Sequence, residues 1–162
     1  MATSETKRVL FVCMGNICRS PTGEGVLRKL VAERGLEDTI EVESAGTIGY
    51  HVGELPDPRM REAASGRGYS LDSRARQFDK ADFERFDLIV AMDRHNLADI
   101  RSLDTAGAHR ERVRLLSDFL DESDEWPVDV PDPYYGGPAG FQKVLDMIEA
   151  ASAQLLATLK PS

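Results

Sequence analysis

A cysteine and an arginine that could together act on a bound anion lie near the N-terminus. They are Cys13 and Arg19, in the run CMGNICRSP that begins at Cys13. Gly15 and Asn16 favour a tight turn, and Pro21 suits the first position of a helix. The backbone N–H groups at such a helix N-terminus attract an anion, and a planar guanidinium matches two phosphate oxygens. The same positive field favours the thiolate form of a cysteine. The run therefore predicts a nucleophile at the floor of a phosphate site, where attack on phosphorus would give a phosphocysteine intermediate.

The spacing of Cys13 and Arg19 is a weak signal by itself, because the chain has fifteen arginines and such a spacing arises easily by chance. A buried structural cysteine would explain the bare spacing better. The context favours the phosphate site: a strand precedes the cysteine, a Gly-Asn turn follows it, and Ser20 and a proline at the helix start complete the run. In open α/β sheets, ligands bind where strands end in this way.

A leaving oxygen needs a proton, so chemistry at this loop would require a general acid from elsewhere in the chain. Asp132 is the candidate, because prolines on both sides restrict its backbone and two tyrosines follow it directly. The acidic run 118–132 favours the protonated form of Asp132, since like charges favour the neutral form of a carboxyl group. By itself the segment is typical of an ordinary turn, and the acidic run is typical of solvated surface.

Short apolar, β-branched runs predict four strands, at 9–13, 39–44, 88–92 and 113–116. Two of them, 9–13 and 88–92, are apolar throughout, which is typical of parallel strands covered on both faces, whereas 39–44 alternates and suits an edge. Helical patterns occur at 21–34, 57–66, 93–103 and 140–159. Strands that alternate with helices predict an α/β fold of three layers, α/β/α, with a parallel sheet in the middle.

The chain has 162 residues and a net charge of −8. This length predicts a single domain, 1–162, and the acidic balance argues against a nucleic-acid partner. The longest apolar run, at 9–14, has six residues, which is too short for a membrane span of about 20 or for a secretory signal. Two cysteines exclude a disulfide-rich scaffold, and the three histidines show no metal-ligand spacing. We therefore expect a soluble cytoplasmic domain.

The sequence resembles the low-molecular-weight protein tyrosine phosphatase family over nearly its whole length. The resemblance rests on five motifs, VCMGNICRSP, SAGT, DPR, AMD and DPYY, which begin at Val12, Ser44, Asp57, Ala91 and Asp132. It implies a four-stranded parallel sheet flanked by helices, with the anion loop after the first strand and neither a metal nor an organic cofactor. It also implies hydrolysis of phosphotyrosine-containing proteins and aryl phosphates, inhibited by the product inorganic phosphate. The oligomeric state is left open by the sequence, with a monomer expected.

The same resemblance implies roles for individual residues. Cys13 would be the nucleophile, Arg19 the phosphate clamp and Asp132 the general acid and then the general base. The phosphate-binding loop would comprise Met14, Gly15, Asn16, Ile17, Cys18 and Ser20, supported by Ser44 and Asp93. Met14 and Ile17 would also wall the pocket for a flat leaving group, together with Tyr50, Tyr134 and Tyr135.

Three residues depart from the pattern of the family, and a second cysteine in the loop suggests redox chemistry. Ser73 stands where relatives often carry a loop-bracing histidine, and Gly23 and Gly25 follow the loop. Each of these glycines costs a helix up to about 1 kcal/mol relative to Ala. Cys18 lies in the curled loop with Cys13, so we expect a reversible disulfide between them after oxidation, the alternative being a small buried filler.

Three other functions remain open. Protein arginine phosphatases have a similar loop but carry Thr where Ile17 stands, and an apolar Ile favours an aryl leaving group. Arsenate reductases use a similar cradle but relay oxidation through later cysteines, whereas this chain has none after Cys18. A phosphate-binding module without catalysis would not need a thiol, an arginine and a positioned aspartate together. Turnover of an aryl phosphate, abolished by Cys13→Ser, would separate an enzyme from a binding module.

Overall fold

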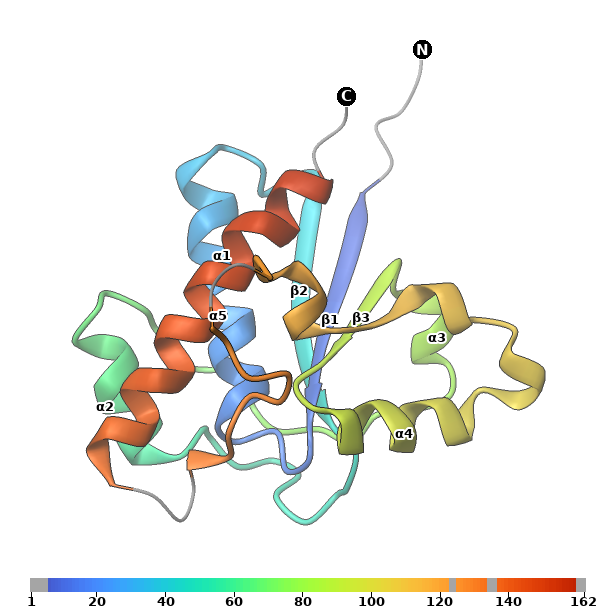
Figure 1. The fold of residues 1–162 in the computed structure, drawn as a ribbon, viewed down its shortest axis with the longest axis horizontal. Helices are drawn as coiled ribbons and strands as arrows, with labels where there is room; N and C mark the ends of the chain where they lie inside the picture. Colours follow the sequence, from blue (N-terminus) through green and yellow to red (C-terminus); the bar gives the residue numbers. More distant parts are fainter. Residues whose placement is uncertain (1–5, 123–124, 134–136, 160–162) are drawn as a thin grey trace.

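A parallel sheet of four strands runs through the centre of the computed structural model, which describes residues 6–122, 125–133 and 137–159 (Figure 1). The strands are β1 Lys7–Cys13, β2 Ile40–Gly46, β3 Leu88–Ala91 and β4 Val113–Leu115. Their order is β2-β1-β3-β4, so β2 forms an edge, as its alternating sequence predicts, and β1 lies between two neighbours. The four predicted strands are confirmed, and their ends agree with the prediction to within two residues.

Helices flank this sheet in the described part of the chain. They are α1 Arg19–Glu33, α2 Pro58–Ser65, α3 Asp82–Arg85, α4 Arg94–Leu103 and α5 Pro138–Leu159. The prediction that the first helix begins at Pro21 is wrong by two residues, because a proline is tolerated within the first turn, where its missing N–H has no helical partner. The single turn of α3 is too short to give a periodic pattern and was not predicted. No helix among the described residues combines the length and apolar character needed to cross a membrane.

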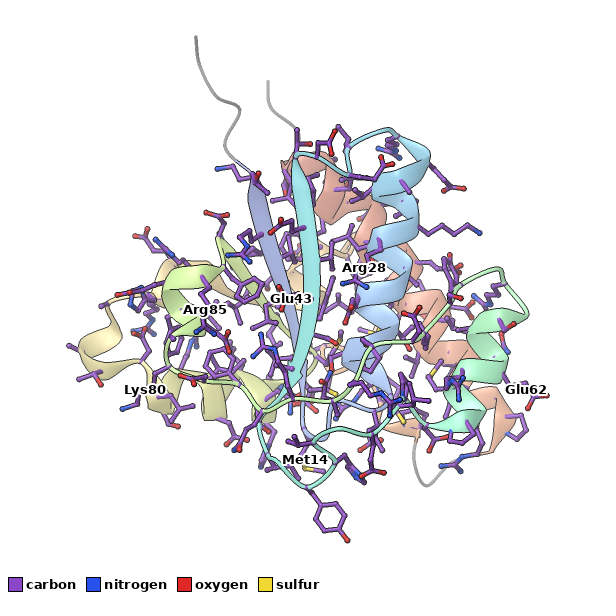
Figure 2. All side chains as sticks on the ribbon, turned by 180° about the vertical axis from the view of Figure 1, so that it is seen from behind. Met14, Arg28, Glu43, Glu62, Lys80 and Arg85 are labelled. Carbon is purple, nitrogen blue, oxygen red and sulfur yellow. The ribbon has the colours of Figure 1, made fainter. Side chains whose placement is uncertain are left out.

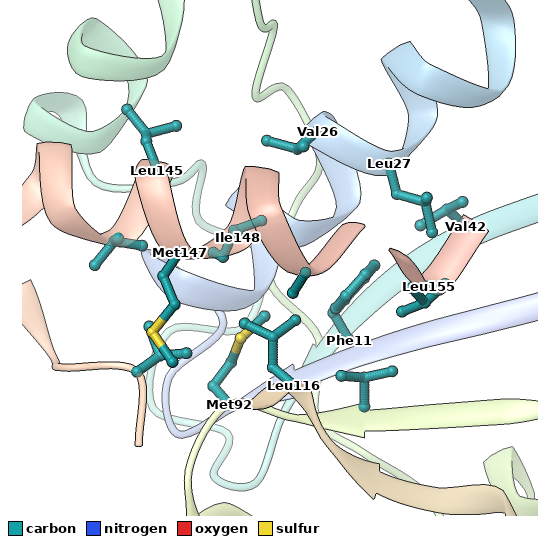
Figure 3. Packing of buried hydrophobic residues seen from close by; sticks show 14 of the residues in the cluster. Phe11, Val26, Leu27, Val42, Met92, Leu116, Leu145, Met147, Ile148 and Leu155 are labelled. Atoms are coloured by element: carbon teal, nitrogen blue, oxygen red, sulfur yellow. The ribbon is translucent and has the colours of Figure 1, made fainter. Parts of the chain in front are cut away.

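The two faces of the sheet are both covered, because side chains of β1 alternate between them. Val9 and Phe11 belong to a core formed with α1, α2 and α5, whereas Leu10 and Val12 belong to a second core formed with α3 and α4. Figure 3 shows part of the first core, in which Phe11 lies with residues of α1 and α5. The predicted three-layer α/β/α architecture is therefore confirmed.

Two glycines of α1 that weaken a helix by propensity are required here by packing. A Cβ atom at Gly23 would lie 2.7 Å from Cδ1 of Phe11, and one at Gly25 would lie 2.4 Å from Cδ2 of Leu71. At both positions an added Cβ would force the neighbouring side chain to shift. The glycines allow α1 to lie close to the sheet and to the segment that contains Leu71.

Two helix N-termini are fixed near the carboxyl ends of the strands, which lie at the lower edge of the sheet in Figure 1. Asp57 caps α2 by accepting a hydrogen bond from the backbone N–H of Arg59 at 2.8 Å. Asp93 caps α4 in the same way, from the N–H of Asn96 at 2.7 Å. Aspartate at this position stabilises a helix because it satisfies an amide that has no partner inside the helix.

Candidate active site

The predicted anion loop lies between the last residue of β1, Cys13, and the first residue of α1, Arg19. Asn16, in the middle of the loop, has a φ of 59°. This left-handed conformation is uncommon for residues other than glycine, and asparagine adopts it more readily than most. Cys18 occupies the cap position of α1 and makes no side-chain hydrogen bond to the helix amides. The first amides of α1 therefore have no side-chain cap, which is the arrangement of a helix N-terminus that binds an anion.

Three loop carbonyl oxygens are engaged by neighbouring segments. The bonds run from Thr47 N to Cys13 O at 2.9 Å, from Ile48 N to Met14 O at 3.1 Å and from Asp57 N to Ile17 O at 2.8 Å. Each bond ties the loop to backbone from the segment after β2 or from the start of α2. The loop is thus held in shape from outside, and these oxygens are directed at their partners rather than at a bound anion.

The thiol of Cys13 is buried, with 2% of the residue exposed, and has a hydroxyl group beside it. Its Sγ atom lies 3.0 Å from the Oγ atom of Ser20. The side-chain amide of Asn16 donates to the same Oγ at 2.8 Å. Because Ser20 Oγ accepts from Asn16, the hydroxyl proton is left for Cys13 or for the carbonyl oxygen of Ala45, which is 3.3 Å away. A thiolate at Cys13 would receive this proton as a hydrogen bond.

Arg19 is 4% exposed and is held on one side. Its Nη1 atom donates to Asp93 Oδ2 at 2.6 Å and to the carbonyl oxygen of Val130 at 3.1 Å. Its Nη2 atom lies 3.8 Å from Asp132 Oδ2. Burial opposes the charge, but negative charge on Cys13 and the contacts with Asp93 and Asp132 outweigh it, so the pKa of the guanidinium lies above its usual value. Arg19 is therefore a fixed cation beside the loop.

These groups line one pocket of about 360 Å³ at the carboxyl edge of the sheet. Its lining residues are Cys13, Met14, Gly15, Ile17, Cys18, Arg19, Ile48, Tyr50, His51 and Asp132. Figure 2 shows Met14 at the lower end of the strands, where this pocket lies. Tyr50 is 82% exposed, so it stands at the rim. The other two predicted walls, Tyr134 and Tyr135, lie outside the described residues.

Ser44, predicted to support the loop, contacts the first turns of α1. Its hydroxyl donates to Glu24 Oε1 at 2.5 Å, and both residues are buried. Glu24 also forms an ion pair with Arg28 at 2.9 Å, and Arg28 Nε donates to the carbonyl oxygen of Val42 in β2. These contacts fasten the end of β2 to the helix that follows the loop. Glu24 was missed in the sequence because nothing local indicates that a helical glutamate is buried.

A family model described as low molecular weight phosphotyrosine protein phosphatase matches residues 8–162. The protein belongs to this family. The low molecular weight protein-tyrosine-phosphatase of Streptomyces coelicolor is 47% identical to this phosphatase over 155 residues, 96% of this chain and 94% of that protein.

Solved structures agree with this assignment. A protein tyrosine phosphatase from Entamoeba histolytica, with Hepes in its active site, has a TM-score of 0.90 at 38% identity and covers 95% of this chain and 97% of its own. A Drosophila arginine phosphatase has a TM-score of 0.86 at 30% identity, over 95% of this chain and 98% of its own. The protein is thus a protein tyrosine phosphatase by family and a hydrolase.

The phosphatase pocket contains one ionisable side chain that the sequence analysis missed, His51. Its Nδ1 atom lies 2.8 Å from Glu54 Oε2, and its ring packs edge-on against Tyr50 with centroids 4.8 Å apart. A Cβ atom at Gly15 would lie 3.0 Å from the His51 ring. His51 belongs to no motif and shows no metal-ligand spacing, so nothing in the sequence indicates its place in the pocket. Among residues 6–122, 125–133 and 137–159, no three His, Cys, Asp or Glu side chains are grouped so as to hold a metal ion.

Proposed function

We propose that this phosphatase hydrolyses phosphotyrosine and other aryl phosphate monoesters through a phosphocysteine intermediate at Cys13. One observation carries the proposal: a buried thiol, a fixed guanidinium and a partly exposed carboxyl group converge on a single pocket of about 360 Å³. Arg19 and the amides at the start of α1 would hold the three non-bridging phosphate oxygens. Ser20 would stabilise the attacking thiolate through the contact of 3.0 Å between its Oγ atom and Sγ.

In the first step the Cys13 thiolate attacks phosphorus and a P–S bond forms, while the bond between phosphorus and the phenol oxygen breaks. Asp132 gives its proton to that oxygen, so tyrosine leaves as a neutral phenol. In the second step Asp132, now ionised, takes a proton from a water molecule that attacks phosphorus. The P–S bond breaks, the thiolate is restored and inorganic phosphate is released. Because phosphate fits the same cradle, we expect it to inhibit the enzyme competitively.

The pocket walls support an aryl substrate. Met14, Ile17 and Ile48 are apolar and line the pocket with the exposed ring of Tyr50 at its rim. A flat phenyl ring would bury apolar area against these side chains, whereas a phosphoarginine side chain would bring a charged guanidinium to them. The similarity to the Drosophila arginine phosphatase makes phosphoarginine the second candidate substrate.

A single set of assays tests the proposal. The purified protein is given phosphotyrosine peptide, an activated aryl phosphate and phosphoarginine, and the same assays are run on Cys13→Ser. We expect turnover of both aryl phosphates, loss of that turnover in the variant, and little release from phosphoarginine. Preferred release from phosphoarginine would overturn the aryl assignment, and turnover by Cys13→Ser would overturn the nucleophile. Binding of phosphate with no turnover of any substrate would indicate a non-catalytic module.

The two cysteines also support a redox control of the enzyme. A peroxide would oxidise the Cys13 thiolate to a sulfenic acid, and the Cys18 thiol would then condense with it, forming a disulfide and releasing water. Both cysteines are free and buried. Burial raises the pKa of Cys18, with Asp57 and Cys13 adding to the effect, so Cys18 stays a thiol. An enzyme that needs free thiols suits a reducing compartment, for which we propose the cytoplasm.

A further inference from the structure

A short segment, residues 73–78, contacts both the segment 46–54 and the phosphate loop, and we refer to it as the strap. Four backbone hydrogen bonds join it to the segment 46–54, which includes the pocket residues Ile48, Tyr50 and His51. They run from Gly46 N to Arg76 O, from Phe78 N to Gly46 O, from Gly53 N to Ala75 O and from Ala75 N to Glu54 O, all between 2.7 and 2.8 Å. The strap therefore fixes the position of one pocket wall.

The strap also contacts the phosphate loop itself. The backbone N–H of Arg76 donates to Asn16 Oδ1 at 3.0 Å. Asn16 has the left-handed conformation that curls the loop, and its amide donates in turn to Ser20. Ser20 lies 3.0 Å from the Cys13 thiol. A continuous path of hydrogen bonds thus leads from the strap to the sulfur atom.

The strap is anchored by a carboxylate that has no accessible surface. Asp82 of α3 is 0% exposed, and its two oxygens accept from Arg76 Nη1 at 2.9 Å and Nη2 at 3.1 Å. The backbone N–H of Asp79 donates to the same carboxylate at 2.8 Å, and Arg85 lies 3.6 Å away. Figure 2 shows Arg85 and Lys80 on one side of the sheet and Arg28 on the other, so this anchor lies on the face opposite α1.

We propose that Arg76 and Asp82 are positioning residues for Cys13, acting through Asn16 and Ser20. The planar, two-pronged ion pair holds the Arg76 side chain and, together with the backbone hydrogen bonds of the strap, keeps Arg76 and its backbone N–H in place. That N–H sets the rotamer of Asn16, which sets the hydroxyl of Ser20 against the sulfur. Loss of the ion pair would loosen Asn16, and the thiolate would lose part of its hydrogen bonding. The inference deepens the proposed function and rests on it for its catalytic consequence.

The variants that test this change only the anchor pair and leave in place the other charged and titratable groups that face the sulfur and the anchor. Facing Cys13 are the hydroxyl of Ser20, the guanidinium of Arg19 and, across the pocket, Asp132, His51 and Cys18. Facing the anchor are Arg85 and, 3.7 Å from Arg76, Glu43 of β2. Asp82→Asn removes one negative charge, which by itself would favour the Cys13 thiolate, so a move of the alkylation midpoint to higher pH would arise from the hydrogen-bonding path.

The experiment compares Asp82→Asn and Arg76→Lys with the parent protein. Arg76→Lys keeps the positive charge but loses the two-pronged contact. The control is Glu149→Gln, which removes a carboxylate bound to Arg67 and Tyr69, between α2 and α5 and away from the pocket. Two quantities are measured for each: the rate of Cys13 alkylation by iodoacetamide against pH, assigned by peptide mass spectrometry, and kcat and KM with an aryl phosphate. Thermal unfolding is recorded for all four proteins.

We expect both anchor variants to move the midpoint of alkylation to higher pH and to lower kcat about tenfold or more, since a displacement of about 1 Å costs roughly 100-fold. KM should change less. The control should lose stability without either change. In an Asn16→Ala background, Asp82→Asn should have no further effect on alkylation, because the path is already broken.

Unchanged alkylation profiles and kcat in Arg76→Lys and Asp82→Asn would overturn the inference, and so would effects that add fully in the Asn16→Ala background. If Asp82→Asn fails to fold, Arg76→Lys decides the question by the same criteria. Alkylation does not depend on turnover, so a shifted profile in a protein without aryl phosphatase activity would refute the proposed function and leave the positioning role intact.

Discussion

Replacement of Asp132 by Asn tests the proposed division between binding and proton transfer. The change keeps the size of the side chain and removes both the proton donor and the charge. For phosphotyrosine, whose phenol is a poor leaving group, loss of a general acid lowers kcat by roughly 10²- to 10⁴-fold. An activated aryl phosphate with a strongly acidic phenol needs less protonation, so its loss should be much smaller.

The effect of Asp132→Asn on phosphate binding follows from the contact between Asp132 and Arg19. Asp132 Oδ2 lies 3.8 Å from Arg19 Nη2, and the Asp132 side chain is 36% exposed. Ion pairs this exposed contribute roughly 0–1 kcal/mol, because solvent screens them. Removing the carboxylate also removes its repulsion of a bound phosphate. The inhibition constant of phosphate should therefore change by less than about fivefold, and in the direction of tighter binding.

The assay measures kcat for Asp132→Asn with phosphotyrosine peptide and with an activated aryl phosphate, and the inhibition constant of phosphate with each. Equal losses of kcat on the two substrates would refute Asp132 as the acid. A large weakening of phosphate binding would instead show that Asp132 holds the loop together. Glu125→Gln, an exposed carboxylate of the same acidic run, serves as the control and should leave all three quantities unchanged.

Three further predictions concern the supports of the site. Asp93→Asn retains the cap of α4, since Asn caps as well as Asp, but removes the negative charge that pairs with Arg19. A charge-assisted hydrogen bond is worth about 1.5–3 kcal/mol, so kcat/KM for an aryl phosphate should fall roughly 10- to 100-fold and the midpoint of thermal unfolding should fall as well. Gly25→Ala should lower the free energy of unfolding in urea by about 1–3 kcal/mol through overpacking against Leu71. Combined with Leu71→Ala, it should cost less than the sum of the two separate losses, because the smaller side chain relieves the overpacking. Cys18→Ser should make inactivation by mild peroxide harder to reverse with a thiol reductant, a result that irreversible sulfinic acid in the parent enzyme would contradict.

The sequence predicts the sheet and the phosphate loop because both depend on neighbours in the chain. The apolar run of β1 and the Gly-Asn turn after it lie within a few residues of each other, so local preference and the final structure agree. The same holds for Asp57 and Asp93, whose cap bonds reach only two or three residues along the chain. The boundary of α1 was missed because Pro21 marks the first turn of a helix rather than its first residue.

The contacts that support the loop could not be predicted in this way. The bond from Arg76 to Asn16 joins residues 60 apart, and the bond from Ser44 to Glu24 joins residues 20 apart. Neither has a local signal, because an arginine and a glutamate look like surface residues in a charged sequence. Ser73 stands at the position where relatives often carry a loop-bracing histidine, but the partner of Asn16 here is the backbone N–H of Arg76.

The carboxylates around Arg19 support the proposal that Asp132 is the proton donor. Hydrogen bonds from the side chain and the backbone of Arg94 lower the pKa of Asp129, so that carboxyl group stays ionised. Both carboxylate oxygens of Asp93 accept hydrogen bonds, one from Arg19 and one from a backbone N–H at the start of α4. A proton donor needs a carboxyl oxygen that carries the proton and can reach the leaving oxygen. The oxygens of Asp93 and Asp129 already accept hydrogen bonds from other groups. Asp132 lines the pocket and lies 3.8 Å from Arg19, which places its carboxyl group beside the site of the leaving oxygen.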